Sequence, residues 1–429
     1  MFRMLASLTT LITAASLVNM ANSTLTTVMP LRMLEDGASG TMVALFGAAF
    51  FLGFAVGCFS QPPVIQRVGY IRAFAAAAGL CTMLAVVMDL TDSVRLWLVL
   101  RFFMGFSVAA IFAAVDGWIN GTATDTVRGK VFAAYGWCLG ASAVLSQLLL
   151  MRFDGMMVGF ITVLALAFNL ALVMVAMTRT PAPIIQADEQ RYDGLIFTST
   201  VSVATAVYAG LVTAAILSTL PAVLAEGGID EIDIGAALGA FFLGRLILQI
   251  PFGIIADRMD LRLLVAIVAG FTGTVVLLGA LLISLGMAQV SSEEGRANWF
   301  LFLVIMTLLG GLVLPLYTLA NSLAFARAEG RPVVRIATSL LLVNSAGAVL
   351  GPLLTAAATP ILATNALTLV IALASAVMVV IALHGRRMEG ASTAVVSMSP
   401  IPVTSVTSNR TMAQAKFEST GSAEGQTSQ

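Results

Sequence analysis

Three ionisable side chains stand inside long apolar stretches of this sequence, at Arg101, Asp116 and Arg245. A charge in the hydrocarbon core of a membrane costs at least about 2.5 to 3.5 kcal/mol, so such residues are functional candidates by default. Arg245 lies near the middle of its stretch, where no acid occurs at the same depth. Its guanidinium therefore needs helix carbonyls, polar side chains, cavity water or an anionic ligand. A second cation at Arg101 would favour an anionic or carboxylate-bearing ligand, unless that side chain reaches the nearer membrane surface instead.

Asp116 lies about one turn from the end of its apolar stretch, where partial hydration lowers the energetic cost of its charge. We expect it to form a gating or structural ion pair with Arg67, Arg128 or Lys130. Binding and release of a proton is the alternative role, because a carboxylate in an apolar environment is a common proton carrier in membrane proteins.

Material for covalent or metal chemistry is scarce. The chain has one histidine, His384, and three cysteines, Cys58, Cys81 and Cys138, without paired spacing. No metal cluster, disulfide framework or catalytic dyad is implied, and no Walker-type glycine-rich loop occurs. No block of lysine or arginine is available to bind a phosphate backbone. We therefore predict a protein that is not an enzyme, has no cofactor and does not bind nucleic acid.

Composition sets the environment in which these residues act. Of 429 residues, 59% are hydrophobic and 10% charged, and the mean hydropathy is +0.99. Soluble domains carry charge on about a quarter of their residues, so this chain belongs in the lipid bilayer. Apolar segments of membrane-spanning length predict an all-α membrane protein with twelve transmembrane helices. They lie at about 5–29, 39–61, 73–90, 95–119, 131–151, 156–177, 196–224, 233–254, 263–286, 298–321, 334–357 and 363–383.

An internal repeat divides these helices into two sets of six. The peptide Ala49 to Gly53 (AFFLG) returns 191 positions later as Ala240 to Gly244. We predict two pseudo-symmetric six-helix bundles, at 1–178 and 196–388, joined by a polar cytoplasmic linker at 179–195. The segment 389–429 is rich in serine and threonine and is expected to be a disordered tail.

The distribution of basic residues predicts the orientation. Fourteen of the 22 lysines and arginines fall in loops and flanks on the same side as the N-terminus, and four fall in loops on the other side. Basic residues of short loops stay in the cytoplasm. We therefore expect a multi-pass protein of the cell (inner) membrane with both termini cytoplasmic and both halves in the same orientation.

Two motifs resemble those of a known family. The stretch Gly253 to Arg262 (GIIADRMDLR) resembles the Gly-x-x-x-Asp-Arg loop of the major facilitator superfamily, and Arg101-x-x-x-Gly105 resembles a second motif of that family. The resemblance covers residues 1 to about 388 and implies two bundles that rock around a central cavity. It assigns a gating latch to Gly253, Asp257, Arg258 and Arg262, and in the other half to Gln66, Arg67, Gly69 and Arg72, with Asp116 as a partner.

The N-terminal copy of the loop motif departs from the family pattern. Pro62 replaces the glycine, and the neutral Gln66 replaces the acid. An uncharged side chain gains less from a helix dipole, so the latch in this half is expected to be weaker.

Polar residues inside the segments mark the expected cavity. Beside Arg245 and Arg101 we assign to its lining Asn22, Gln147, Tyr208, Gln249, Tyr317 and Asn344. Each could instead form a hydrogen bond between helices.

The sequence leaves several functional alternatives open. A secondary transporter of a small solute, working by alternating access, is the favoured interpretation. A sensor or scaffold that retains the fold without transport is the alternative, suggested by Pro62 and Gln66. Within transport, efflux of amphiphilic compounds competes with movement of a small anionic metabolite. Coupling to a proton through Asp116, symport with another ion and facilitated movement are all compatible with the sequence.

Overall fold

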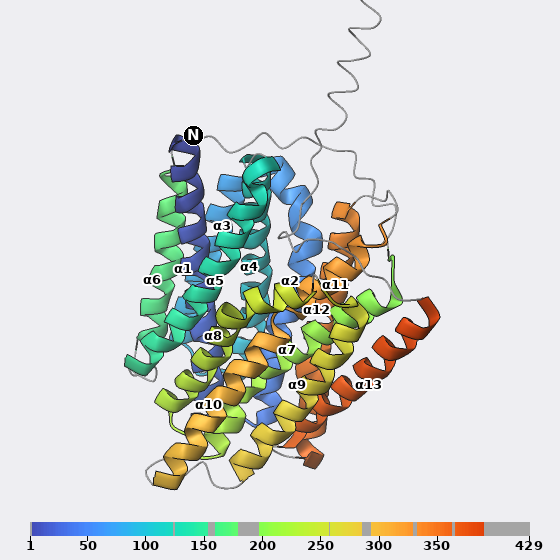
Figure 1. Ribbon diagram of the computed structural model, residues 1–429. Coiled ribbons are helices and arrows are strands. Elements are labelled where there is room, and N and C mark those ends of the chain that lie inside the picture. The colour runs from blue at the N-terminus through green and yellow to red at the C-terminus, as the bar shows by residue number, and fades with distance from the viewer. Residues whose placement is uncertain are drawn as a thin grey trace, which may run out of the picture.

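The computed structural model describes residues 2–122, 125–152, 159–178, 197–256, 258–284, 293–328, 333–362 and 365–389. These residues form helices and no strands (Figure 1). The first half contains α1 (Phe2–Glu35), α2 (Gly40–Val68), α3 (Tyr70–Asp89), α4 (Val94–Thr122), α5 (Asp125–Arg152) and α6 (Phe160–Ala176). The second half contains α7 (Thr200–Glu226), α8 (Glu231–Ala256), α9 (Leu261–Ser284), α10 (Glu293–Val313), α11 (Leu316–Phe325), α12 (Val333–Leu362) and α13 (Asn365–Glu389).

The predicted all-α membrane class is confirmed. Nine stretches of the described chain are long and apolar enough to cross a membrane, and the apolar α6 is shorter. The thirteen helices occupy the positions of the twelve predicted segments, because α10 and α11 together replace the segment at 298–321.

Below, the side of the bundle at which α1 begins is called the N side, and the opposite side is called the far side.

Pro315 accounts for the break between α10 and α11. Proline has no backbone N–H, so it removes one i to i−4 hydrogen bond from a helix interior. Helix α11 begins at the next residue, Leu316, and the N–H of Thr318 donates to the carbonyl oxygen of Pro315 at 2.9 Å. Together the two helices form one apolar stretch, Ala297–Phe325, that is long enough to cross a membrane, so the predicted segment at 298–321 contains a helix break at Pro315.

Equivalent helices pack in the same way in the two halves. In the first half α2 packs on α4, α1 on α5 and α6, and α3 on α4 and α6. The counterparts in the second half are α8 on α10, α7 on α12 and α13, and α9 on α10 and α13. The duplicated sequence has therefore produced duplicated packing.

The repeated AFFLG peptide lies at the tightest of these contacts. In α2, Gly53 packs on the backbone of Phe102 in α4, and the carbonyl of Phe50 packs on Gly105. In α8, Gly244 packs on the backbone of α10, and the carbonyl of Phe241 packs on Gly310. Without a Cβ at these positions the helix backbones come into direct contact, as small residues allow in membrane bundles.

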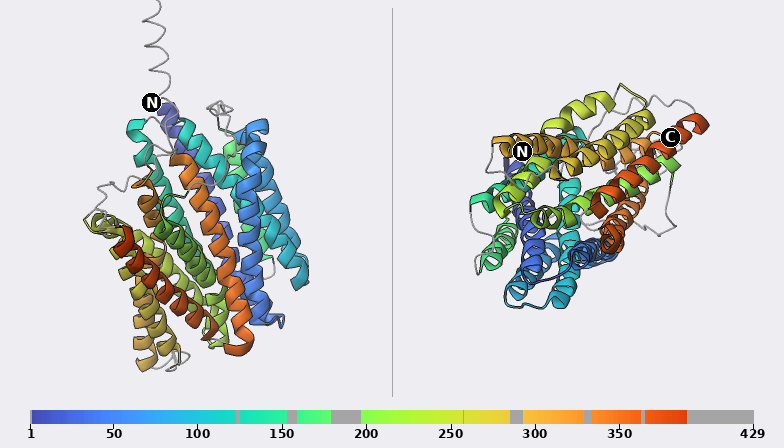
Figure 2. Two further views of the ribbon diagram at one scale, coloured as in Figure 1. Left: turned by 90° about the vertical axis from the view of Figure 1, so that its right-hand side faces the viewer. Right: turned by 90° about the horizontal axis from the view of Figure 1, so that it is seen from below.

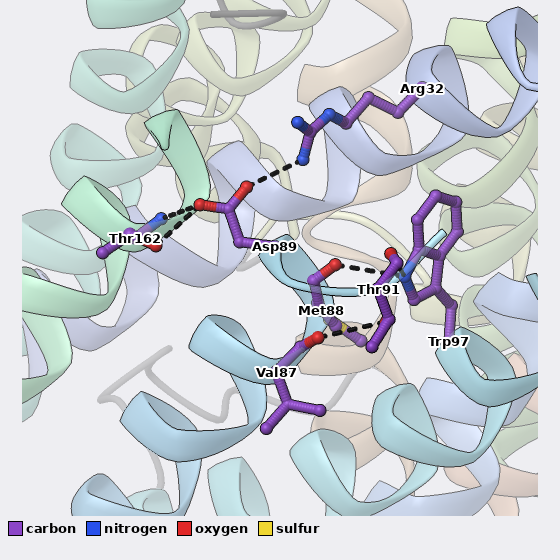
Figure 3. A network of polar contacts seen from close by, with 7 residues as sticks. All are labelled: Arg32, Val87, Met88, Asp89, Thr91, Trp97 and Thr162. Atoms are coloured by element: carbon purple, nitrogen blue, oxygen red, sulfur yellow. Dashed lines mark hydrogen bonds and ion pairs between the residues drawn. The ribbon is translucent and has the colours of Figure 1, made fainter. Parts of the chain in front are cut away.

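A polar cluster ties the helices of the first half together at the far side (Figure 3). The Asp89 carboxylate at the end of α3 accepts from Arg32 of α1 at 3.0 Å, and from the backbone N–H and hydroxyl of Thr162 in α6 at 3.1 and 2.6 Å. The indole N–H of Trp97 in α4 donates to the carbonyl oxygens of Met88 and Thr91 at 3.1 and 2.9 Å. Four helices are thereby fixed to one another.

The two halves meet mainly through α2 with α7 and α12, α5 with α8, and α1 with α7. The orange α12 stands beside the blue α2 in Figure 2. Described contacts of small residues across this interface lie from the middle of the bundle to the far side. They are Gly40 with Glu226 and Thr359, Thr41 with Ala356, Gly47 with Ser218, Gly235 with Met151, and Gly140 with Leu246. Within the described chain, α4 and α5 make no extended contact with α11 or α12.

The close contact at Gly105 predicts a sensitive position. A Cβ at residue 105 would overlap the carbonyl oxygen of Phe50, whereas a Cβ at Gly136 in α5 would meet no atom within 4 Å. We expect Gly105→Ala to lower the thermal midpoint of the detergent-solubilised protein, at a cost of about 1 to 3 kcal/mol. Gly136→Ala should leave the midpoint unchanged or raise it, because alanine is the better helix former. Equal midpoints for the two variants would contradict this account of the α2–α4 contact.

Candidate functional site

Arg101 lies in the interior of the first half. Its side chain is 2% exposed, and its two terminal nitrogens donate to Thr26 Oγ1 at 2.6 Å and Asn22 Oδ1 at 3.3 Å, both in α1. The guanidinium carbon also lies 4.4 Å from the ring centroid of Phe50 and 5.1 Å from that of Phe46. Such a position over aromatic faces stabilises a cation electrostatically. Neutral groups thus surround Arg101, and no described carboxylate pairs with it.

The polar face of α1 continues from Arg101 to α5. The hydroxyl of Thr27 donates to Gln147 Oε1 at 3.2 Å, and Gln147 is fully buried. Further toward the N side, Asn19 Nδ2 donates to the Leu139 carbonyl and the Ser142 hydroxyl, both at 3.0 Å. The structure therefore brings Asn22 and Arg101 together, and uses Gln147 in a contact between α1 and α5.

Helix α8 presents three distinct faces. Gly235, Gly239 and Leu246 contact α5, while Phe241 and Gly244 contact α10. A third face carries exposed apolar side chains and is the one that lipid would cover: Leu243, Ile247 and Ile254.

Arg245 and Gln249 occupy what remains of the α8 surface. With 3.6 residues per turn they point between the α5 and α10 contacts, away from the apolar face. Arg245 is nevertheless half-buried rather than buried, and Gln249 is exposed. Partial exposure of both side chains is what the wall of a cavity between the halves would show.

Within the described residues no side chain forms a hydrogen bond or an ion pair with Arg245. Its environment differs in this respect from that of Arg101, whose terminal nitrogens are occupied. A permanently charged guanidinium in an apolar region needs water or an anion when the protein supplies no partner.

Asp116 is paired with a hydroxyl group. Its carboxylate accepts a hydrogen bond from the buried Tyr135 of α5, and its backbone carbonyl accepts from Asn120 Nδ2 at 2.9 Å. Arg67 is exposed and does not pair with Asp116. The side chains of Arg128 and Lys130 lie outside the described residues. Tyr135 was not anticipated from the sequence, although its position in the neighbouring segment at similar depth was a usable signal.

The loop motifs are placed as follows. Gly69 follows the last residue of α2 with a φ of 85°, a backbone conformation that favours glycine. Gln66 and Arg67 precede it in the last turn of α2 and are exposed, and Arg72 lies in the first turn of α3. In the second half Gly253 lies within α8, and Arg258 is exposed after it. Asp257 lies outside the described residues.

A contact missed by the sequence reading closes the second loop. Arg386 Nε at the end of α13 donates to Asp260 Oδ2 at 3.2 Å, and Asp260 Oδ1 accepts from the backbone N–H of Arg262 at 3.0 Å. Arg262 itself is 1% exposed. The acid at 260 and the basic pair at 386 and 387 were visible in the sequence, but no pattern there indicated that the two segments meet.

The other residues predicted to line the cavity differ in the direction in which their side chains point. Asn344 in α12 donates to the carbonyl of Ala206 in α7 at 2.9 Å, and Tyr317 in α11 is half-buried. Tyr208 in α7 instead points toward α13, where its hydroxyl lies 2.7 Å from that of Ser375. Tyr208 therefore lies apart from Arg245.

Comparison with known proteins agrees with this architecture. No family model matches the chain. The uncharacterised MFS-type transporter YcaD from Escherichia coli O6:K15:H31 (strain 536 / UPEC) is 27% identical over 81% of the chain and 87% of the relative. YcaD from Escherichia coli O9:H4 (strain HS) gives the same values.

Solved structures share the fold at low sequence identity. The nucleoside transporter NupG has a TM-score of 0.67 and 10% identity, covering 90% of this chain and 100% of that chain. A POT family transporter in complex with 5-aminolevulinic acid has a TM-score of 0.69 and 12% identity, covering 88% and 94%. A D-xylose-proton symporter has a TM-score of 0.62 and 14% identity, covering 87% and 97%. With its duplicated helix packing and its loop motifs, the chain has the fold of the major facilitator superfamily and is similar in sequence to an MFS-type transporter.

Proposed function

We propose that this secondary transporter moves a small solute bearing a carboxylate or phosphate, and that Arg245 binds the anionic group. The single observation that carries the proposal is the half-buried guanidinium of Arg245 on the interior face of α8, without a protein partner among the described residues. Desolvation strengthens a charge-assisted hydrogen bond, so such a group would select for anions. The exposed Gln249 one turn away adds a neutral polar contact for the rest of the solute.

The interface between the halves supports alternating access. Small residues bring α2 against α7 and α12 at the far side, while α4 and α5 make no extended contact with α11 or α12 in the described chain. A cavity at Arg245 would then open to the N side in this state. Rocking of the two six-helix bundles, at 1–178 and 196–388, would close the N side and open the far side.

The N side is assigned to the cytoplasm of an inner-membrane protein. The arginines at the end of α2, the start of α9 and the end of α13 all lie on this side of the bundle, as the positive-inside rule requires of a cytoplasmic face. They are Arg67, Arg262, Arg386 and Arg387. Asp116, paired with Tyr135 near the same side, is the candidate for proton coupling.

The anion proposal is tested first by ligand stabilisation. We expect a thermal-shift screen of purified protein against carboxylates, inorganic phosphate, sugar phosphates and their neutral analogues to return anions, because a ligand that binds the folded state raises its midpoint. Arg245→Ala should abolish both that shift and flux in proteoliposomes while keeping the ligand-free midpoint. Arg95→Ala, which removes an exposed arginine from the first turn of α4, is the matched control and should behave as the parent protein. A screen that returns only neutral or cationic compounds, or near-normal flux in Arg245→Ala, would overturn the proposal.

Replacement of Arg101 by alanine is expected to affect stability, unlike replacement of Arg245. Its truncation leaves Asn22 and Thr26 without their partner and opens a space beside the rings of Phe46 and Phe50. We predict that Arg101→Ala lowers the ligand-free thermal midpoint, at a cost of about 2 to 5 kcal/mol. The ligand-free thermal midpoint should therefore fall in Arg101→Ala and stay the same in Arg245→Ala. An unchanged midpoint in Arg101→Ala would contradict the packing role of Arg101.

Alternating access is tested by closing the far side covalently. A Cβ placed on Gly40 would lie 3.5 Å from Thr359 Cγ2, so the sulfur of a cysteine at position 359 could reach a cysteine at position 40. In a background lacking Cys58, Cys81 and Cys138, oxidation of Gly40→Cys/Thr359→Cys should stop flux of a compound identified by the screen, and reduction should restore it. Each single-cysteine variant should be insensitive to oxidant. Continued flux through fully cross-linked protein would exclude opening of this interface.

A further inference from the structure

A groove on the outer surface of the second half is separate from the proposed transport site. It runs between α7, α12 and α13, has a volume of about 720 Å³ and is lined almost entirely by apolar side chains. Several of these are exposed, among them Leu354, Leu369 and Val377, so the groove opens toward the surrounding lipid. The hydroxyls of Tyr208 and Ser375 are hydrogen-bonded to each other, and both residues are buried between α7 and α13.

The groove changes from apolar to polar along α7. Val207, Ala204, Val203 and Thr200 lie on one face of the helix, at spacings of three and four residues. Ala204 and Val207 line the apolar groove, whereas Thr200 and Val203 line a second hollow of about 380 Å³ at the N-side end of the helix. The two hollows therefore follow one another along α7, with exposed Thr200 at the membrane-surface end.

Helix α13 shows the same change of character. Its groove-lining residues Ala374, Val377 and Ile381 are followed on the same face by His384. His384 and Arg387 are both exposed in the last turns of the helix, and Arg387 pairs with no described residue. Arg386 is already engaged by Asp260. The apolar groove thus ends on the N side beside a cationic group that is available to a ligand.

We propose that this groove binds one anionic phospholipid of the N-side leaflet, with an acyl chain along α13 and the phosphate at Arg387. From Arg387 to the groove-lining Ala374, α13 rises about 20 Å, at about 1.5 Å per residue. That length is close to one leaflet, head group included, of a bilayer about 40 to 45 Å thick. An acyl chain gains little by leaving other lipid chains, so the preference for this site comes from shape and from the charge at its polar end.

The proposal separates chain binding from head-group binding. Ala374→Phe fills the groove, whereas Ala376→Phe places the same ring on the exposed surface of α13 outside it. Arg387→Gln removes the cation, and Arg95→Gln removes an exposed arginine at the far side as its matched control. All four are made in the full chain, and thermal midpoints establish that each variant is folded.

Native mass spectrometry of the detergent-purified protein, titrated with phosphatidylglycerol or phosphatidylcholine, measures the binding. We expect one phosphatidylglycerol to bind in preference to phosphatidylcholine, and Ala374→Phe to lose that lipid while Ala376→Phe retains it. Arg387→Gln should reduce the preference for phosphatidylglycerol about fivefold, as expected for one basic residue near an anionic head group. Equal binding of the two lipids by the parent protein, or equal retention by the two phenylalanine variants, would overturn the proposal.

Discussion

A hydrocarbon environment does not solvate charge, and this constraint determines how the interior of the protein is organised. Arg101 meets it with neutral partners: Asn22 and Thr26 from α1, and the rings of Phe46 and Phe50 from α2. A guanidinium held in this way joins three helices without the desolvation of a second charge that a buried carboxylate would require. The carboxylate of Asp116 is likewise satisfied by a neutral partner, the hydroxyl of Tyr135. Arg245 is the described cation inside the bundle that this arrangement leaves unmatched.

The internal repeat explains where the exception arises. The duplicated peptide fixes α2 on α4 and α8 on α10 through Gly53 and Gly244, so the residues that follow these glycines occupy equivalent places in the two halves. Phe54 and Arg245 are such a pair. The packing has been retained on both sides, and the chemistry of the adjoining position has diverged. A binding group can change at this position without disturbing the helix contact beside it.

Sequence reasoning located the helices well because apolar length and charged turns are strong signals, and the duplicated packing follows from the repeat. It was less able to assign partners. Opposite charges were matched by depth, which suggested Arg67 for Asp116, but a hydroxyl donor satisfies a carboxylate with less desolvation. Tyr208 was assigned to the cavity by residue type, yet α7 is apolar around most of its circumference, so nothing in its pattern indicated which way the side chain points. The partners of Arg101 depend on the rotation of α1 about its axis, which hydropathy does not specify.

The contrast between contacts within and between the halves bears on how the protein could move. Within the first half, Asp89 fixes α1 to α3 and α6, and glycine contacts fix α2 to α4. Across the interface, the far-side contacts involve small residues, with a hydrogen bond of 3.5 Å from Thr41 to Ala356. Contacts of this kind contribute little individually, so two arrangements of the halves can lie within a few kcal/mol of each other. A ligand that binds one arrangement more tightly could then shift the balance between them. Motion of the halves as rigid bundles would be confined to the interface between them, and Arg245 lies on the inner face of α8 beside that interface.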